Sequence, residues 1–419
     1  MLNRDFFKIE LVKNFSKHFT GTFGSALISF ALMPVFTRLF SPEEFGLYYL
    51  YLSIVGTLPT LATGRYEHAL MLPSSDNNAA NILVGSLTIS FIFCALLFGV
   101  CLVYGDQIGA LLNNTALIKW FPLCIAATFL ISFNQLVSYW IVRKKDFLGS
   151  SKNKIVQSGG TSLATFGLGS AKLFNGLIVG DFIGKCLLFI FGMYQLKKNN
   201  FGGVKRSLIG NDLIKYKDFP LYNAVPSVLD KFSLNMPVVI ISSFFSASIN
   251  GFVNLPKQIL GTPLSLISAS ISQVYFQNII EKKNLNQLIV PQLLKAIKFL
   301  SLIAVVFVIG TLLCSEIVFE VVFGEEWKIA GYYAKILSFA IAIKFVVSPL
   351  SIVFPSLNKM KIGSFWQVLY FIAICTLFFL ESFSIEYFLI IYVIIELLMY
   401  SFYLFLIVKV AKEHDRNLS

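Results

Sequence analysis

The sequence predicts an all-α integral membrane protein, with about twelve transmembrane helices in two six-helix lobes around a central cavity. Of its 419 residues, 56% are hydrophobic and only 13% are charged, whereas soluble proteins carry about 25% charged residues. The mean hydropathy is +0.75, so lipid must cover much of the surface. The apolar runs are continuous, as at 386–408, and exceed the roughly 20 residues that cross a bilayer as a helix. They lack the alternation that marks barrel strands, so helices are expected.

The first predicted span follows a basic N-terminal segment and is too long for the apolar core of a signal peptide. We therefore expect it to remain in the protein as a membrane helix. The fifth and eighth spans are the least apolar, because glycine and polar residues dilute them. The approximate spans are 17–38, 45–64, 79–104, 117–141, 154–175, 176–196, 219–245, 251–275, 288–314, 332–356, 362–381 and 386–409.

An internal repeat relates the two halves of the chain. Met33-Pro34-Val35 recurs as Met236-Pro237-Val238, and Gly56-Thr57 recurs as Gly261-Thr262. An even number of spans in each half gives both halves the same orientation, so the repeat is predicted to be parallel, with a pseudo-twofold axis along the membrane normal. The predicted domains are a six-helix lobe at 1–196, a basic cytoplasmic linker at 197–218 and a second six-helix lobe at 219–419.

Prolines and polar residues concentrate in the first, second, seventh and eighth spans. Pro34, Pro59, Pro237, Pro256 and Pro263 all fall within them. Interrupted, polar helices are tolerated in a membrane only where protein or a water-filled cavity covers them. We therefore expect these four spans to surround the central cavity and the more apolar spans to face lipid.

Charge predicts the orientation. Basic runs such as Arg143-Lys144-Lys145 and Lys197-Lys198 lie in segments that share one side of the membrane with both termini, whereas the opposite loops carry Glu43-Glu44 and Glu325-Glu326. The positive-inside rule then places both termini in the cytoplasm. This asymmetry accounts for the net charge of +12, so no nucleic-acid partner is predicted.

Motifs for catalysis are lacking in the sequence. The segment from Gly180 to Lys185 is like a phosphate-binding loop, but it has one residue too few between its glycines and no Ser or Thr after the lysine. The six cysteines lie inside apolar runs without metal-ligand spacing, and the three histidines are scattered near span ends. We therefore predict neither an enzyme nor a cofactor or metal site.

Ionisable residues inside spans are the informative ones, because they are costly in hydrocarbon and mark transport pathways. Asp181 and Lys185 are four residues apart and can neutralise each other on one helix face. Asp230 and Lys231 are adjacent, so they point apart and need separate partners. Lys335 can extend to the membrane interface.

Cations outnumber acids among these residues, which suits an anionic cargo such as pyrophosphate. The candidate substrate-binding residues are Arg38, Arg65, Lys231, Lys257 and Lys344. Asp181, Asp230 and Glu396 are the candidates for a coupling ion, and Glu396 could instead neutralise one of the lysines.

Three segments resemble a known family. Residues 37–46 (TRLFSPEEFG), 65–73 (RYEHALMLP) and 217–222 (KDFPLY) are similar to segments of Wzx-type O-antigen and polysaccharide flippases. These belong to the superfamily that also contains multidrug extruders and lipid II flippases. Family members often carry arginine where this chain has Lys257, which would lose the bidentate phosphate geometry of arginine.

The resemblance implies a two-lobed bundle with a cationic cleft. It implies alternating access that carries an undecaprenyl-pyrophosphate-linked oligosaccharide to the periplasmic face, coupled to an ion or to the membrane potential. A polysaccharide polymerase and chain-length proteins are candidate partners, besides the lipid bilayer.

Two alternatives stay open. One is a multidrug or other lipid exporter of the same superfamily, but organic cations would favour an acidic cavity. The other is an O-antigen polymerase or ligase. Such enzymes typically have a large periplasmic loop that carries arginines, whereas the outer loops predicted here are short and acidic.

Overall fold

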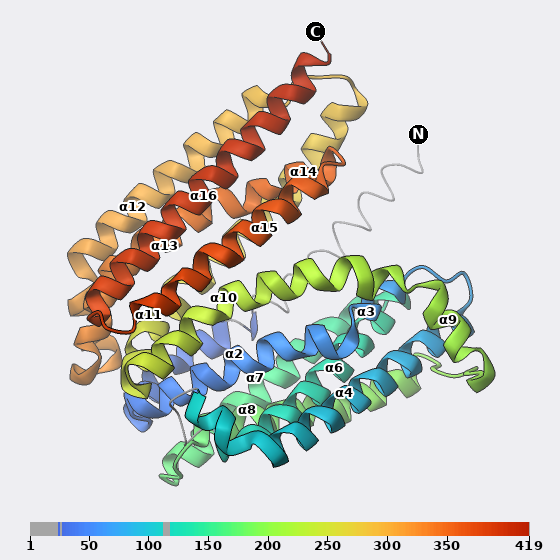
Figure 1. The fold of residues 1–419 in the computed structure, drawn as a ribbon, viewed down its shortest axis with the longest axis horizontal. Coiled ribbons are helices and arrows are strands. Elements are labelled where there is room, and N and C mark those ends of the chain that lie inside the picture. The colour runs from blue at the N-terminus through green and yellow to red at the C-terminus, as the bar shows by residue number, and fades with distance from the viewer. Residues whose placement is uncertain (1–23, 26, 112–117, 419) are drawn as a thin grey trace. The chain divides into compact units, whose positions relative to one another are not determined.

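A computed structural model describes residues 24–25, 27–111 and 118–418, and the regular structure in these ranges is entirely helical (Figure 1). Ten helices in this part of the chain are long and apolar enough to cross a membrane. The prediction of an all-α multi-pass membrane protein is therefore confirmed. The start of the first predicted span, with Lys17, and the basic residues that precede it, Arg4, Lys8 and Lys13, lie outside the described ranges.

The chain divides into an N-terminal unit, Met1–Ser243, and a C-terminal unit, Phe244–Ser419. The N-terminal unit contains a helix at Leu27–Leu39, α2 (Pro42–Thr63), α3 (Tyr66–Ala69), α4 (Asp76–Leu111), α6 (Phe121–Arg143), α7 (Phe147–Ser170), α8 (Gly176–Lys198), α9 (Ile209–Lys215) and α10 (Val225–Phe244), which ends at the boundary. The C-terminal unit contains α11 (Ala247–Asn284), α12 (Val290–Phe323), α13 (Lys328–Val347), α14 (Val353–Ser356), α15 (Met360–Cys375) and α16 (Ile385–Arg416).

Two predicted spans differ from the other ten. The fifth, 154–175, overlaps α7, a helix of 24 residues that begins at Phe147 and ends at Ser170. This helix is not among those apolar enough to cross a membrane. The described part of the first is the short apolar helix Leu27–Leu39. The twelve-helix, two-lobe arrangement and the domain boundaries at 196 and 219 therefore stay predictions.

The segment 37–46 contains the N-terminus of α2. Ser41 caps α2 in a capping box, in which its side chain accepts from the Glu44 N–H and the Glu44 carboxylate accepts from the Ser41 N–H at 3.0 Å. The other oxygen of Glu44 accepts from the N–H of Asn175 at 2.9 Å. Asn175 lies in the turn between α7 and α8, and Glu44 is buried. One carboxylate thus ties the start of α2 to that turn.

Glycines bring α7 and α8 together. A Cβ on Gly180 would lie 2.8 Å from the backbone nitrogen of Thr165, and one on Gly184 would lie 2.8 Å from that of Thr161. Small residues at a spacing of four allow membrane helices to approach closely. The glycines that gave this segment its likeness to a phosphate loop therefore serve helix packing.

Within the N-terminal unit, the segment between α8 and α10 packs against α3 and α4. The buried amide of Asn81 in α4 donates to Asp212 at 2.7 Å and accepts from the N–H of Lys205 at 2.8 Å. The Tyr66 hydroxyl donates to the carbonyl of Leu213 at 3.1 Å. These bonds attach α9 to α3 and α4.

Candidate functional site

A backbone turn after α2 positions the first candidate cation. Gly64 and Arg65 are consecutive left-handed residues, with φ of 55° and 62°. This conformation costs free energy in a non-glycine residue. The Arg65 Nη1 lies 3.5 Å from Oε1 of Glu67, which is buried. The arginine is therefore paired with a carboxylate of its own turn.

His68, in the same turn, contacts α6. Its Nδ1 and the Tyr139 hydroxyl form a hydrogen bond of 2.9 Å, and the two rings meet edge to face. Burial, and to a lesser degree the charge of Arg65, lower the pKa of His68. The imidazole is thus held in its neutral form against Tyr139.

Asp181 and Lys185 form an ion pair on one face of α8. Both side chains are buried, and Nζ of Lys185 lies 5.3 Å from the centroid of the Tyr51 ring. The pairing predicted from their spacing is present, with a cation–π contact added to it. The pair neutralises its own charge inside the N-terminal unit.

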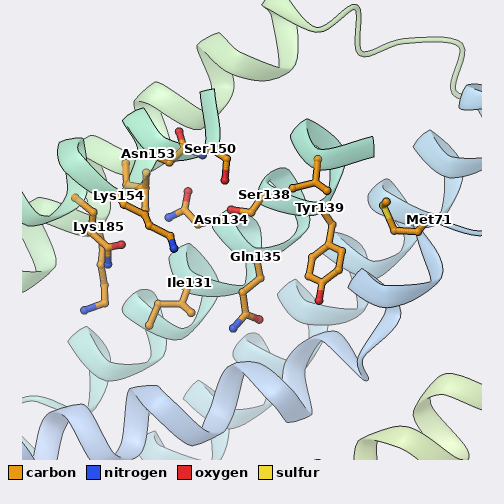
Figure 2. A pocket seen from close by; sticks show the side chains of 13 residues that line it. Met71, Ile131, Asn134, Gln135, Ser138, Tyr139, Ser150, Asn153, Lys154 and Lys185 are labelled. Atoms are coloured by element: carbon orange, nitrogen blue, oxygen red, sulfur yellow. The ribbon is translucent and has the colours of Figure 1, made fainter. Parts of the chain in front are cut away.

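A cavity of about 530 Å³ lies next to this pair, among α6, α7 and α8 (Figure 2). Its described lining includes two lysines and no acidic side chain. The remaining polar lining consists of amides and hydroxyls. The lining residues on α6 and α7 that carry polar groups are Asn134, Gln135, Ser138, Tyr139, Ser150, Asn153, Lys154 and Gln157, and Lys185 enters from α8.

Apart from Lys185, the sequence reasoning missed this cavity. Its amides and hydroxyls are neutral and follow no motif, so nothing in their spacing marks a site. The available signal was the weak hydropathy of the fifth span, where a polar helix faces a protein-lined space rather than lipid.

In the C-terminal unit, Lys344 of α13 meets Glu396 of α16. The Lys344 Nζ lies 2.7 Å from Oε1 of Glu396, which is fully buried. The Tyr370 hydroxyl donates to the same oxygen at 2.9 Å. Of the two roles left open for Glu396, the structure places it as the partner of a lysine.

Lys257 of α11 shares an aromatic neighbour with Lys344. Nζ of Lys257 lies 4.7 Å from the centroid of the Tyr392 ring, and Nζ of Lys344 lies 5.8 Å from it. Both distances fall within the cation–π range. The ammonium groups of Lys257 and Lys344 and the carboxylate of Glu396 therefore lie around Tyr392. Their net charge is positive when all three are ionised.

The other candidates lie elsewhere. Arg38 is exposed near the end of the helix Leu27–Leu39, and Asp230 and Lys231 lie on α10, half-buried and exposed respectively. Lys335 pairs with Glu316 at 2.5 Å. In the described ranges no group of three or more His, Cys, Asp or Glu side chains could hold a metal ion. The substrate and coupling roles of all these residues stay predictions.

Comparison with known proteins places the chain in a family. The family model described as "Polysaccharide biosynthesis protein" matches residues 35–330. The chain is also similar to the teichuronic acid biosynthesis protein TuaB of Bacillus subtilis (strain 168), at 24% identity over 159 residues. That match covers 37% of this chain and spans only 33% of the relative.

Solved structures share the fold. The lipid II flippase MurJ in an inward closed conformation superposes with a TM-score of 0.75 at 14% identity, over 95% of this chain and 89% of that one. An inward-facing multidrug resistance MATE family transporter of the MOP superfamily gives 0.64 at 16% identity, over 94% of both chains. A MOP superfamily transporter from Pyrococcus furiosus gives 0.61 at 13% identity, over 98% and 95%. The chain thus has the fold of MOP superfamily transporters, and it belongs to the polysaccharide biosynthesis protein family whose model matches most of its length.

Proposed function

We propose that this chain is a flippase for a lipid-linked oligosaccharide. Its cargo would be a repeat unit on undecaprenyl pyrophosphate, carried from the cytoplasmic to the outer face of the bacterial inner membrane by alternating access. The observation that carries the proposal is the pair of lysines, Lys257 and Lys344, on one tyrosine ring inside a membrane unit. An uncompensated cation is costly there, and an anionic group such as pyrophosphate would offset it.

The family and the fold support the same cargo class. A polysaccharide biosynthesis protein with a transporter fold is expected to move a glycan, and a glycan on a lipid carrier needs a protein to pass its polar part through the bilayer. Lysine acts on phosphate as a point charge. Two point charges without the bidentate geometry of arginine suit a cargo that must be released as well as bound.

A multidrug exporter for organic cations fits the site less well. Such a cargo would need carboxylates that no cation of the protein neutralises. Glu396 is instead paired with Lys344, and Asp181 with Lys185. For coupling we propose an ion or the membrane potential, with Glu396, Asp181 and Asp230 as the candidate ion-binding acids. A polymerase and chain-length proteins are the proposed partners.

The test is deletion in a strain whose surface polysaccharide depends on this chain. We expect intact lipid-linked repeat units to accumulate on the cytoplasmic face, out of reach of membrane-impermeant enzymes added outside, while surface polysaccharide is lost. Surface lipid capped with single repeat units would instead identify a polymerase. Unchanged polysaccharide with increased sensitivity to cationic drugs would identify a multidrug exporter.

A further inference from the structure

The cavity among α6, α7 and α8 is formed by the N-terminal unit alone, whereas the lysine pair behind the proposed function lies in the C-terminal unit. Its volume of about 530 Å³ lies within the roughly 300–1,000 Å³ of small-molecule sites. Its chemistry differs from that of the lysine pair, because amides and hydroxyls dominate its lining. We therefore expect the cavity to bind a different chemical group from the one that the lysine pair binds.

Two adjacent amides of α6 have unmet hydrogen-bonding capacity at this cavity. Nδ2 of Asn134 and Oε1 of Gln135 are both out of contact with solvent and have no hydrogen-bond partner among the described residues. Both side chains line the cavity (Figure 2). One atom is a donor and the other an acceptor, and leaving such buried groups unpaired is unfavourable. Consecutive residues of a helix point about 100° apart, so the two amides need separate partners. Neither atom is accessible as it stands, so a rotation of each side chain towards the cavity is needed to pair it with a polar group of a ligand.

The walls around these amides are held in place by bonds outside the cavity. The Gln195 amide of α8 donates to Asn153 Oδ1 at 3.3 Å and to the carbonyl of Gly149 at 3.2 Å. Tyr139 is held by His68. Asn153 and Tyr139 therefore face the cavity from fixed positions, which lowers the entropic cost of binding a rigid ligand.

We propose that this cavity binds a sugar ring of the glycan cargo through its hydroxyl groups, with Asn134 and Gln135 as the specificity-determining contacts. The proposal rests on the proposed function for the identity of the cargo. Each sugar hydroxyl both donates and accepts, so neighbouring hydroxyls match the unpaired donor and acceptor. A site built to bond hydroxyl groups discriminates strongly against molecules that lack them. An acyl chain or an apolar drug would leave both amides unpaired.

The test measures sugar binding directly, on the purified full chain in lipid nanodiscs. The probe is the oligosaccharide that mild acid releases from the carrier lipid of the same cells, so that it carries no lipid and no pyrophosphate. Saturation-transfer NMR reports which ring protons contact the protein. The variant is Asn134→Leu with Gln135→Leu, which keeps side chains of similar size suited to a membrane helix. Asn235→Leu, which removes an amide from α10 bonded to Thr57, is the control.

We expect binding by the wild type and the control, and binding weaker by about tenfold or more in the double variant, since each lost bond contributes about 1 kcal/mol. Equal transfer to wild type and double variant, or transfer to neither, overturns the proposal. Tetraphenylphosphonium serves as a second probe, an organic cation without hydroxyl groups. The proposal is also overturned if the double variant loses binding of this cation but keeps binding of the sugar. These results are independent of export. A wild type that exports normally but fails the sugar test refutes the subsite alone, whereas a deletion that leaves export intact refutes the proposed function.

Discussion

Lys344 and Glu396 lie 52 residues apart in sequence, yet Nζ of the lysine and Oε1 of the glutamate are 2.7 Å apart. Glu396 is fully buried. The hydroxyl of Tyr370 also donates a hydrogen bond to Oε1 of Glu396. The carboxylate therefore depends on these two partners for the stability of its charge. It also lowers the net positive charge that Lys344 and Lys257 present together.

Removing one member of this pair is expected to destabilise the protein more than removing both. Lys344→Leu leaves Glu396 as an uncompensated buried charge, at a cost on the order of 3 kcal/mol. Lys344→Leu combined with Glu396→Leu removes both charges and should recover part of that loss. Thermal unfolding of the purified variants in one detergent measures the difference. If the double variant were less stable than Lys344→Leu, the two side chains would not act as a pair.

The bond between Glu44 and Asn175 is expected to stabilise the N-terminal unit. Glu44→Ala removes the capping box of α2 and the acceptor for the Asn175 N–H, at a cost of about 1–3 kcal/mol. Glu43→Ala is the matched control, because Glu43 lies in the same first turn but is exposed. Thermal unfolding should show a lower melting temperature for Glu44→Ala than for Glu43→Ala. Equal melting temperatures would contradict the structural role of Glu44.

Local signals predicted much of this fold. Hydropathy located ten of the twelve predicted spans, because each apolar run is a property of one segment. The ion pair of Asp181 and Lys185 followed from a spacing of four within one helix. The fifth span was harder to define, since α7 mixes lysine, serine and glycine with apolar residues. Its polar face lines a cavity, so hydropathy alone understates its place in the fold.

The sites depend on contacts between distant segments, and the sequence could predict only their residue types. Nothing local relates Lys344 to Glu396, or Lys257 to Tyr392, because each pair joins two helices. The cavity was harder still to predict, because Asn134 and Gln135 are uncharged and belong to no motif. Their importance depends on the packing of α6 against α7 and α8, which leaves their amide atoms unpaired.

His68 is expected to make stability depend on pH. Its pKa is lowered from 6.5 by burial and by Arg65, so as pH falls below about 6.5 the unfolded chain takes up a proton before the folded one does. Stability is therefore fully present above pH 6.5 and is lost as pH falls through that value towards the folded pKa. Unfolding measured from pH 8 to 5 should show a loss for wild type that is smaller in His68→Gln. A parallel pH dependence of the two proteins would exclude His68 as the cause.

The charge asymmetry predicts that both termini lie in the cytoplasm and that the loop around Glu325 faces outward. Reporter domains that are active only outside the cytoplasm should be inactive when fused after Ser419 and active when inserted near Glu325. A reporter that is active only in the cytoplasm should give the reverse. The opposite result with both reporters would invert the orientation and the direction in which the cargo is proposed to move.

Lys257 is expected to be needed for export because of its charge. Its ammonium group lies over the Tyr392 ring, 4.7 Å from the centroid, where fixed cations would replace the water that pyrophosphate loses on entering the membrane. Lys257→Gln should reduce surface polysaccharide several-fold at a normal protein level. Lys257→Arg keeps the charge and the cation–π contact and should retain most export. Lys361→Gln, at an exposed position at the start of α15, controls for loss of a lysine as such. Normal export by Lys257→Gln, alone and combined with Lys344→Gln, would refute a role for these two lysines in binding the cargo.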